Sequence, residues 1–182
     1  MRPSLLGWLL RDGAIIATFI LLAVSLADVG AFISILGFIT AYIVIYAMHE
    51  WGHLLGARAT QSEMPLAPYK SALIGFFDPA NHSQKQFLAL SWGGVIGYLV
   101  TSAVMVLSYL VTPTWFNAGA AVAGLAFTVQ SLAVDLPQII QVQRGADATT
   151  TNQAGTQPKL ILKRTWQTWV PLGALLTLWN VA

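Results

Sequence analysis

Long runs of apolar residues occupy most of this chain and restrict the folds that it can adopt. Four runs, each bounded by polar or turn-forming residues, cover residues 13–26, 31–57, 87–111 and 115–142. A bilayer requires about 20 residues per helix, so the first run fits better if it starts at Leu5 and the Arg11 side chain reaches back to the membrane surface. Only 9% of the residues are charged, whereas soluble domains carry roughly a quarter. We therefore expect an all-α fold, a polytopic transmembrane helix bundle of about four to five spans.

The segments outside these runs suggest three parts. Residues 1–144 would form the transmembrane core, and no convincing signal-peptide cleavage site follows the first run, so we expect that run to be retained. Residues 145–158 are rich in Thr, Ala and Gly and are expected to be a flexible linker. Residues 159–182 combine a basic segment with a last apolar run that contains Pro171. That run could cross the bilayer as a fifth span or lie along its surface.

The basic residues predict the orientation of the spans. If the four runs alternate in direction, every Lys and Arg falls on one side of the membrane, and this side is expected to be the cytoplasm of a cell (inner) membrane. The residues concerned are Arg2, Arg11, Arg58, Lys70, Lys85, Arg144, Lys159, Lys163 and Arg164. Because they lie between apolar runs, the net charge of +2 does not indicate nucleic acid as a partner, and the apolar runs themselves make a lipid bilayer the expected partner. Trp8 is expected to be an aromatic anchor at the membrane surface.

Three ionisable residues stand close together near the end of the second run, as His49-Glu50-Trp51-Gly52-His53. Two histidines four residues apart lie on one face of a helix and can hold a zinc ion, and Glu50 beside them can act as the base for the attacking water. A membrane span normally excludes such groups, so their presence favours a functional site over histidines buried for packing. The chain has no cysteine, which excludes cysteine-ligated zinc and thiol catalysis.

Asp135 is the strongest candidate for a third zinc ligand. It is an acid within the fourth run, nine residues before Arg144, and His49 lies nine residues before Arg58. At about 1.5 Å per residue, both groups lie about 13–14 Å inside the basic boundary. The alternative is a structural role for Asp135, in a helix–helix hydrogen bond or beside the kink at Pro137.

Two other residues compete for the third position. Asp78 and His82 occupy a turn-like polar stretch between the second and third runs, where ordinary solvated loop residues are the simpler interpretation.

Together these motifs resemble the site-2 protease family of intramembrane zinc metalloproteases. His49 to His53 matches the family's HExxH motif, and Asp135 is similar in position to the Asp of its Leu-Asp-Gly motif. Residues 86–94, Gln-Phe-Leu-Ala-Leu-Ser-Trp-Gly-Gly, resemble the stretch that leads into the family's Ala-Gly-Pro-x-x-Asn segment. The resemblance implies a site-2-protease-like core with Zn²⁺ on His49, His53 and Asp135.

The sequence also departs from the family pattern. Gly94 replaces the usual Pro, Gly97 the usual Asn, and Leu136 the Gly after the ligand Asp. Gly93 and Gly97 form a small-xxx-small pair, for which close helix packing is the expected role.

The resemblance further implies a substrate, namely a transmembrane segment of another protein, cut near the cytoplasmic face. Such a segment must unwind before its peptide bonds are accessible. Residues 69–77 could offer a strand edge to the unwound segment, or they could form an interfacial loop with apolar anchors.

Two other functions remain open at this stage. One is a catalytically idle relative that binds membrane proteins, and an intact Glu50 argues against it. The other is a metal or solute carrier, and the absence of an internal repeat argues against that.

Overall fold

The computed structural model describes residues 3–26, 30 and 32–155 of the chain. These residues form five α-helices and one short 3₁₀ helix, and they contain no β-strand. The helices in chain order are α1 (Leu5–Ser25), α2 (Ile33–Ala59), η1 (Pro79–Asn81), α3 (Gln84–Val111), α4 (Trp115–Gln143) and α5 (Ala148–Gly155). The last apolar run of the sequence lies outside the described residues.

Four of these helices, α1 to α4, are long and apolar enough to cross a membrane. Their bounds agree with the four predicted runs to within a few residues, and α1 takes the longer form that begins at Leu5. The prediction of an all-α bundle of apolar, membrane-spanning length is therefore confirmed for the part of the chain that the structure describes.

Polar capping residues fix where three of the four long helices, α1, α3 and α4, begin. The Ser4 hydroxyl accepts the Gly7 amide at the start of α1, and the Thr114 hydroxyl accepts the Asn117 amide at the start of α4. Ser83 and Gln86 form a reciprocal capping box at the start of α3, which satisfies two backbone amides that the first turn leaves free. These caps explain why the helices start directly after polar residues.

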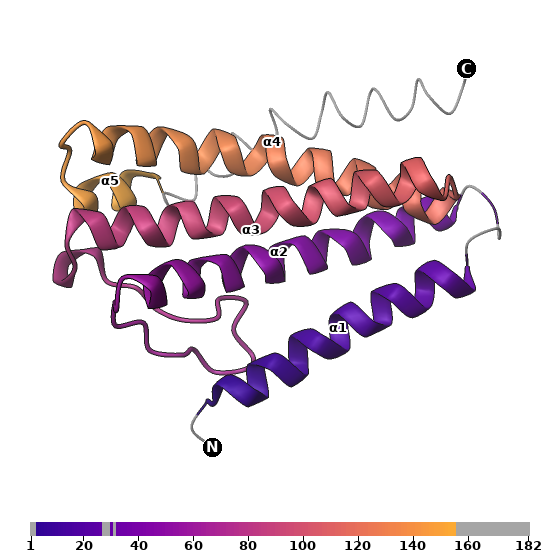
Figure 1. Ribbon diagram of the computed structural model, residues 1–182, viewed down its shortest axis with the longest axis horizontal. Helices are drawn as coiled ribbons and strands as arrows, with labels where there is room; N and C mark the ends of the chain where they lie inside the picture. The colour runs from indigo at the N-terminus through magenta and orange to yellow at the C-terminus, as the bar shows by residue number, and fades with distance from the viewer. Residues whose placement is uncertain (1–2, 27–29, 31, 156–182) are drawn as a thin grey trace.

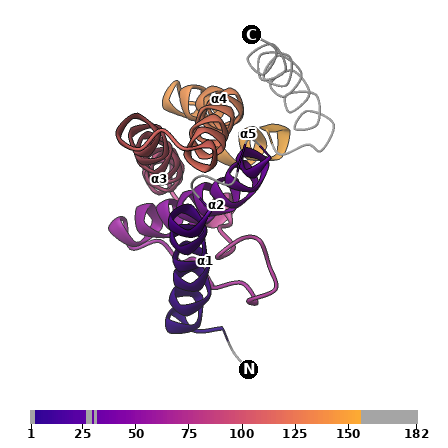
Figure 2. The same cartoon turned by 90° about the vertical axis from the view of Figure 1, so that its right-hand side faces the viewer.

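The four long helices are not equivalent in their packing. α2, α3 and α4 all contact one another closely, whereas α1 contacts mainly α2. Figure 1 shows α1 diverging from α2 toward its own N-terminus, and the segment between α2 and α3 lies in the opening between them. The view in Figure 2 also places α1 apart from the α3–α4 pair. Helices α2, α3 and α4 therefore form a three-helix core, and α1 packs against one side of it.

Glycines allow α2 and α3 to approach until their backbones touch. A Cβ added to Gly52 would lie 2.2 Å from the Gly93 carbonyl oxygen, and one added to Gly93 would lie 2.2 Å from that of Gly52. A Cβ on Gly97 would lie 2.4 Å from the Met48 carbonyl oxygen. The close packing predicted for Gly93 and Gly97 is thus confirmed, since larger residues would separate the two helices.

The segment between α2 and α3 contains a short hairpin, residues 64–76. Leu66 and Gly75 form an isolated antiparallel bridge, flanked by hydrogen bonds from Ala67 N–H to the Ile74 carbonyl and from Phe76 N–H to the Pro65 carbonyl. Residues 74–76, part of the segment 69–77 that was expected to offer a strand edge, are therefore already paired with residues 65–67 of the hairpin.

Part of the expected flexible linker is instead a helix. Residues 148–155 form α5, and the Asp147 carboxylate accepts the Thr150 amide at its start. Ala148 joins Phe87 and Val142 in a small apolar cluster, so α5 is held against the start of α3 and the end of α4. The composition alone did not reveal this helix, because Thr, Asn and Gly have low helix propensity and are typical of linkers.

Candidate metal centre

The two histidines of α2 point their ring nitrogens at each other. His49 and His53 are four residues apart, and their Nε2 atoms are 3.0 Å from each other. Two ring nitrogens on one tetrahedral zinc ion would be about 3.3 Å apart, given Zn–N bonds of about 2.0–2.1 Å. The separation of the two nitrogens is therefore within a few tenths of an ångström of the separation that one zinc ion requires.

A backbone carbonyl of α3 sets the orientation of His53. The Nδ1 of His53 lies 2.9 Å from the carbonyl oxygen of Leu90, which can only accept a hydrogen bond. Nδ1 therefore carries the proton, and the Nε2 of a neutral ring keeps its lone pair for a metal ion. His49 differs, because its buried Nδ1 has no hydrogen-bond partner among the described residues.

Glycines of α3 make this arrangement possible. A Cβ on Gly94 would lie 2.3 Å from Cε1 of the His53 ring, so the ring occupies the space that a side chain would need. The contact of Gly52 with Gly93 brings the α3 backbone close enough for the Leu90 carbonyl to reach that ring. The resembled family has proline at position 94, and here glycine is needed because the His53 ring fills the space of a side chain.

Glu50 completes the group at the same level of α2. One ligand atom each from His49, Glu50 and His53 lies within 4.8 Å of the other two. Glu50 is only 6% exposed, and its Oε2 accepts a hydrogen bond of 3.1 Å from the Ile74 amide in the hairpin. Tyr46, one turn earlier, also interacts with this carboxylate. The carboxylate is therefore held in place beside the histidines.

Asp135 lies on α4 and falls outside this three-residue group. Its Oδ2 is buried without a hydrogen-bond partner within the described part of the chain, and its carboxylate interacts electrostatically with Glu50 and Tyr98. Asp135 thus faces the same region of the bundle with one oxygen free. Its role as third ligand stays a prediction.

Asp78 and His82 make other contacts. The Asp78 carboxylate caps η1 through the Ala80 amide at 3.1 Å and accepts the Asn81 side chain at 2.6 Å. The His82 ring stacks on Phe77, and its Nδ1 lies 2.7 Å from the Asp78 carbonyl oxygen. These contacts support the simpler interpretation that both residues serve the loop.

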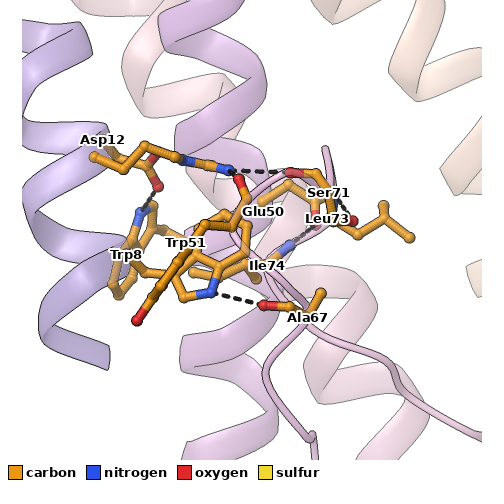
Figure 3. A network of polar contacts seen from close by, with 10 residues as sticks. Trp8, Asp12, Glu50, Trp51, Ala67, Ser71, Leu73 and Ile74 are labelled. Atoms are coloured by element: carbon orange, nitrogen blue, oxygen red, sulfur yellow. Dashed lines mark hydrogen bonds and ion pairs between the residues drawn. The ribbon is translucent and has the colours of Figure 1, made fainter. Parts of the chain in front are cut away.

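The sequence reasoning missed a polar cluster on α1. Asp12 is 3% exposed; its two carboxylate oxygens accept the Arg11 Nε and the Trp51 indole N–H, both at 2.7 Å. Figure 3 shows Trp8 and Asp12 on one side of Glu50 and Trp51, with the hairpin residues on the other. The signal was present in the sequence, since Asp12 is an acid within an apolar run, the same criterion that singled out Asp135.

Trp8 also differs from its expected role. It is fully buried under the hairpin, and its indole N–H donates to the Ala67 carbonyl at 3.1 Å. It therefore does not project toward a membrane surface as an anchoring aromatic would.

The chain matches no protein-family model, no curated protein and no solved structure with which it was compared. Fold and site together define a helical membrane protein with a His-Glu-His group that could bind a metal ion.

The donor set fits zinc. Two imidazoles with converging Nε2 atoms, one of them oriented by a backbone carbonyl, are the ligands and the outer contact that zinc sites commonly use. The Oδ2 of Asp135 is a buried polar atom without a hydrogen-bond partner among the described residues, and a bound ion would offset the cost of burying it.

Proposed function

We propose that this chain is an intramembrane zinc metalloprotease of the site-2 protease type, which cuts transmembrane segments of other proteins. The observation that carries the proposal is the convergence of the His49 and His53 Nε2 atoms, 3.0 Å apart, with the Glu50 carboxylate beside them on an apolar helix. A site that only binds metal would not need a base beside its ligands, and Glu50 is placed where it could serve as one.

His49 and His53 would hold Zn²⁺, with Asp135 as the third ligand. Asp135 lies on α4, which packs against α2, and its buried Oδ2 has no hydrogen-bond partner among the described residues, so this oxygen is available to a metal ion. Three protein ligands with an open fourth position are typical of catalytic zinc.

The chemistry would divide between the metal and Glu50. When bound, zinc would act as a Lewis acid toward the scissile carbonyl and the attacking water. Glu50 would take a proton from that water as its oxygen forms the new bond to the carbonyl carbon. It would then give the proton to the leaving amine as the peptide C–N bond breaks, so that the carboxylate is regenerated.

The distribution of charge supports cleavage near the cytoplasmic face. The start of α1, the end of α2, the start of α3 and the end of α4 lie at the same end of the bundle, at the left of Figure 1. The described basic residues belong to this end, and they are Arg11, Arg58, Lys70, Lys85 and Arg144. By the positive-inside rule this end would face the cytoplasm of a cell membrane, and His49 and His53 lie in the half of α2 nearer to it.

The test compares wild-type protein with Glu50→Gln in proteoliposomes and in cells. The Gln side chain can still accept the Ile74 amide but cannot take a proton, so the fold is preserved while the base is lost. We expect new fragments of single-span membrane proteins with the wild type only, and loss of this cleavage when zinc is removed by a chelator. Metal analysis of purified protein should show zinc in both proteins and not in His49→Ala.

Two outcomes would contradict the proposal. Zinc bound without any Glu50-dependent cleavage across the membrane proteome would favour an idle relative or a metal carrier. Absence of bound zinc from correctly folded wild-type protein would remove the metal site itself.

A further inference from the structure

The hairpin 64–76 contributes an unusual contact to Glu50. A regular antiparallel ladder would pair the Ile74 N–H with the Ala67 carbonyl, since Ala67 N–H already donates to the Ile74 carbonyl at 3.0 Å. Instead, the Ile74 N–H donates to Glu50 Oε2 at 3.1 Å, and the Ala67 carbonyl accepts the Trp8 indole N–H at 3.1 Å. The donor of the missing ladder bond, the Ile74 N–H, is thus directed to α2, and its acceptor, the Ala67 carbonyl, is directed to α1.

The hairpin is fastened to α1 along one face of that helix. Ser4, Gly7, Trp8 and Arg11 recur at spacings of three and four residues, which places them on one stripe of the helix. The Tyr69 ring lies against Gly7, where a Cβ would come 2.3 Å from its hydroxyl oxygen, and this hydroxyl accepts the Ser4 amide at 2.7 Å. The tip of the hairpin therefore follows α1.

Arg11 makes the strongest of these contacts. Its Nη1 donates to the carbonyls of Tyr69 and Ser71 at 3.1 and 3.0 Å, and its guanidinium lies 3.7 Å from the centre of the Trp8 ring. Asp12 holds the Arg11 Nε at 2.7 Å and is itself tied to α2 through the Trp51 indole. A charged pair in an apolar helix is costly, so a role beyond packing is expected for it.

We propose that Arg11 and Trp8 are positioning residues for Glu50. They hold the hairpin on α1, and the held hairpin presents the Ile74 amide that fixes one oxygen of the Glu50 carboxylate beside the histidines. Arg11 also interacts with this carboxylate electrostatically, which favours the same placement. The inference rests on the proposed function for the role of Glu50 as base, but the placement itself can be tested without any cleavage.

The first readout is the reactivity of Glu50 toward dicyclohexylcarbodiimide, an apolar reagent that adds to carboxyl groups within membranes. Residue-level mass spectrometry would follow the adduct on Glu50 in wild type, Arg11→Gln and Trp8→Phe, with Arg58→Gln as the matched control. Arg58 is exposed and belongs to the same end of the bundle. We expect modification to be about tenfold faster in the first two variants, because hydrogen bonds of ordinary strength are lost, and unchanged in the control. Trp8→Phe keeps an aromatic ring at this position but removes the pyrrole part of the indole with its N–H, so it tests the bond to Ala67 and remains informative if Arg11→Gln fails to fold.

The second readout is cleavage of a transmembrane peptide that the wild type cuts. A displaced base should lower kcat about 100-fold with little change in KM, since small misplacements of catalytic groups have effects of this size. Arg11→Lys, which keeps the charge, should recover part of the loss.

Two results would overturn the proposal. One is unchanged Glu50 modification in folded Arg11→Gln and Trp8→Phe proteins. The other is faster cleavage in Arg11→Gln, which would show that the hairpin obstructs the site. If the wild type cuts no peptide, the proposed function fails, and the carbodiimide result still decides whether α1 places Glu50.

Discussion

The Nδ1 of His53 lies 2.9 Å from the carbonyl oxygen of Leu90, so the backbone of α3 determines which nitrogen of this α2 histidine is free for a metal ion. This contact joins a candidate ligand to the packing of two helices. Whatever changes the distance between α2 and α3 should therefore also change metal binding.

Gly94→Ala should weaken zinc binding while leaving the bundle folded. The new methyl group would lie 2.3 Å from His53 Cε1 and would turn the ring away from the Leu90 carbonyl. Loss of such an outer contact reduces metal affinity by about 10- to 100-fold. Competition with a zinc chelator of known affinity would measure the change. Gly13→Ala is the control, because a Cβ there meets nothing within 4 Å. Equal affinity in Gly94→Ala and wild type would show that the ring has another position available.

Gly93→Ala should instead reduce stability. Its methyl group would approach the Gly52 carbonyl oxygen at 2.2 Å, where only movement of a helix could relieve the overlap. Overpacking of this kind costs about 1–3 kcal/mol. Thermal unfolding in detergent, followed by tryptophan fluorescence, should show a lower midpoint than for wild type and for Gly13→Ala. An unchanged midpoint would mean that α2 and α3 tolerate a wider separation.

Asp135→Asn should lower zinc affinity by at least about tenfold if this carboxylate completes the metal shell, because the amide is a weaker ligand. Metal titration of purified protein would measure it. Glu63→Gln is the matched control, since Glu63 is an exposed acid in the loop. If Asp135→Asn binds zinc as tightly as the wild type, Asp135 is not a ligand, and the alternative structural role, a contact between helices, applies.

Asp147 should make α5 sensitive to acid. The hydrogen bond from the Thr150 amide holds the pKa of the Asp147 carboxyl below its usual value. A lowered pKa in the folded state means that the cap stabilises α5 above about pH 4 and is lost as pH falls through the lowered pKa. Hydrogen exchange of the Ala148–Gly155 amides, corrected for intrinsic rates, should therefore show protection at neutral pH that declines in acid. In Asp147→Ala the protection should be weaker and should not change with pH in this range. Exchange as fast as in an unfolded peptide at neutral pH would instead support the flexible linker expected from composition.

Much of the architecture could be predicted because it depends on local patterns. Runs of apolar residues give membrane-length helices, and the four predicted runs correspond to α1 to α4. The helix at residues 148–155 was not predicted, since it forms through contacts of Ala148 with Phe87 and Val142, which are distant in sequence.

In the candidate site too, some features could be predicted from the sequence and others could not. The spacing of His49 and His53 implies convergence, because residues four apart share a helix face. The hold on Glu50 by the Ile74 amide could not be predicted, since it requires a hairpin whose position depends on Arg11 and Trp8 of another helix.

The amino-acid sequence by itself thus determined four apolar helices and a histidine pair with a carboxylate beside it, because these features follow from the period of one helix and from the length of apolar runs. Only the tertiary structure decided that Leu90 orients His53 and that the hairpin holds Glu50. It also decided that Arg11 fastens the hairpin to α1 and that Asp12 fastens α1 to α2. The physical reason is that each of these contacts joins segments far apart in the chain. Their distances depend on how closely glycine-lined helices pack, which no local pattern specifies.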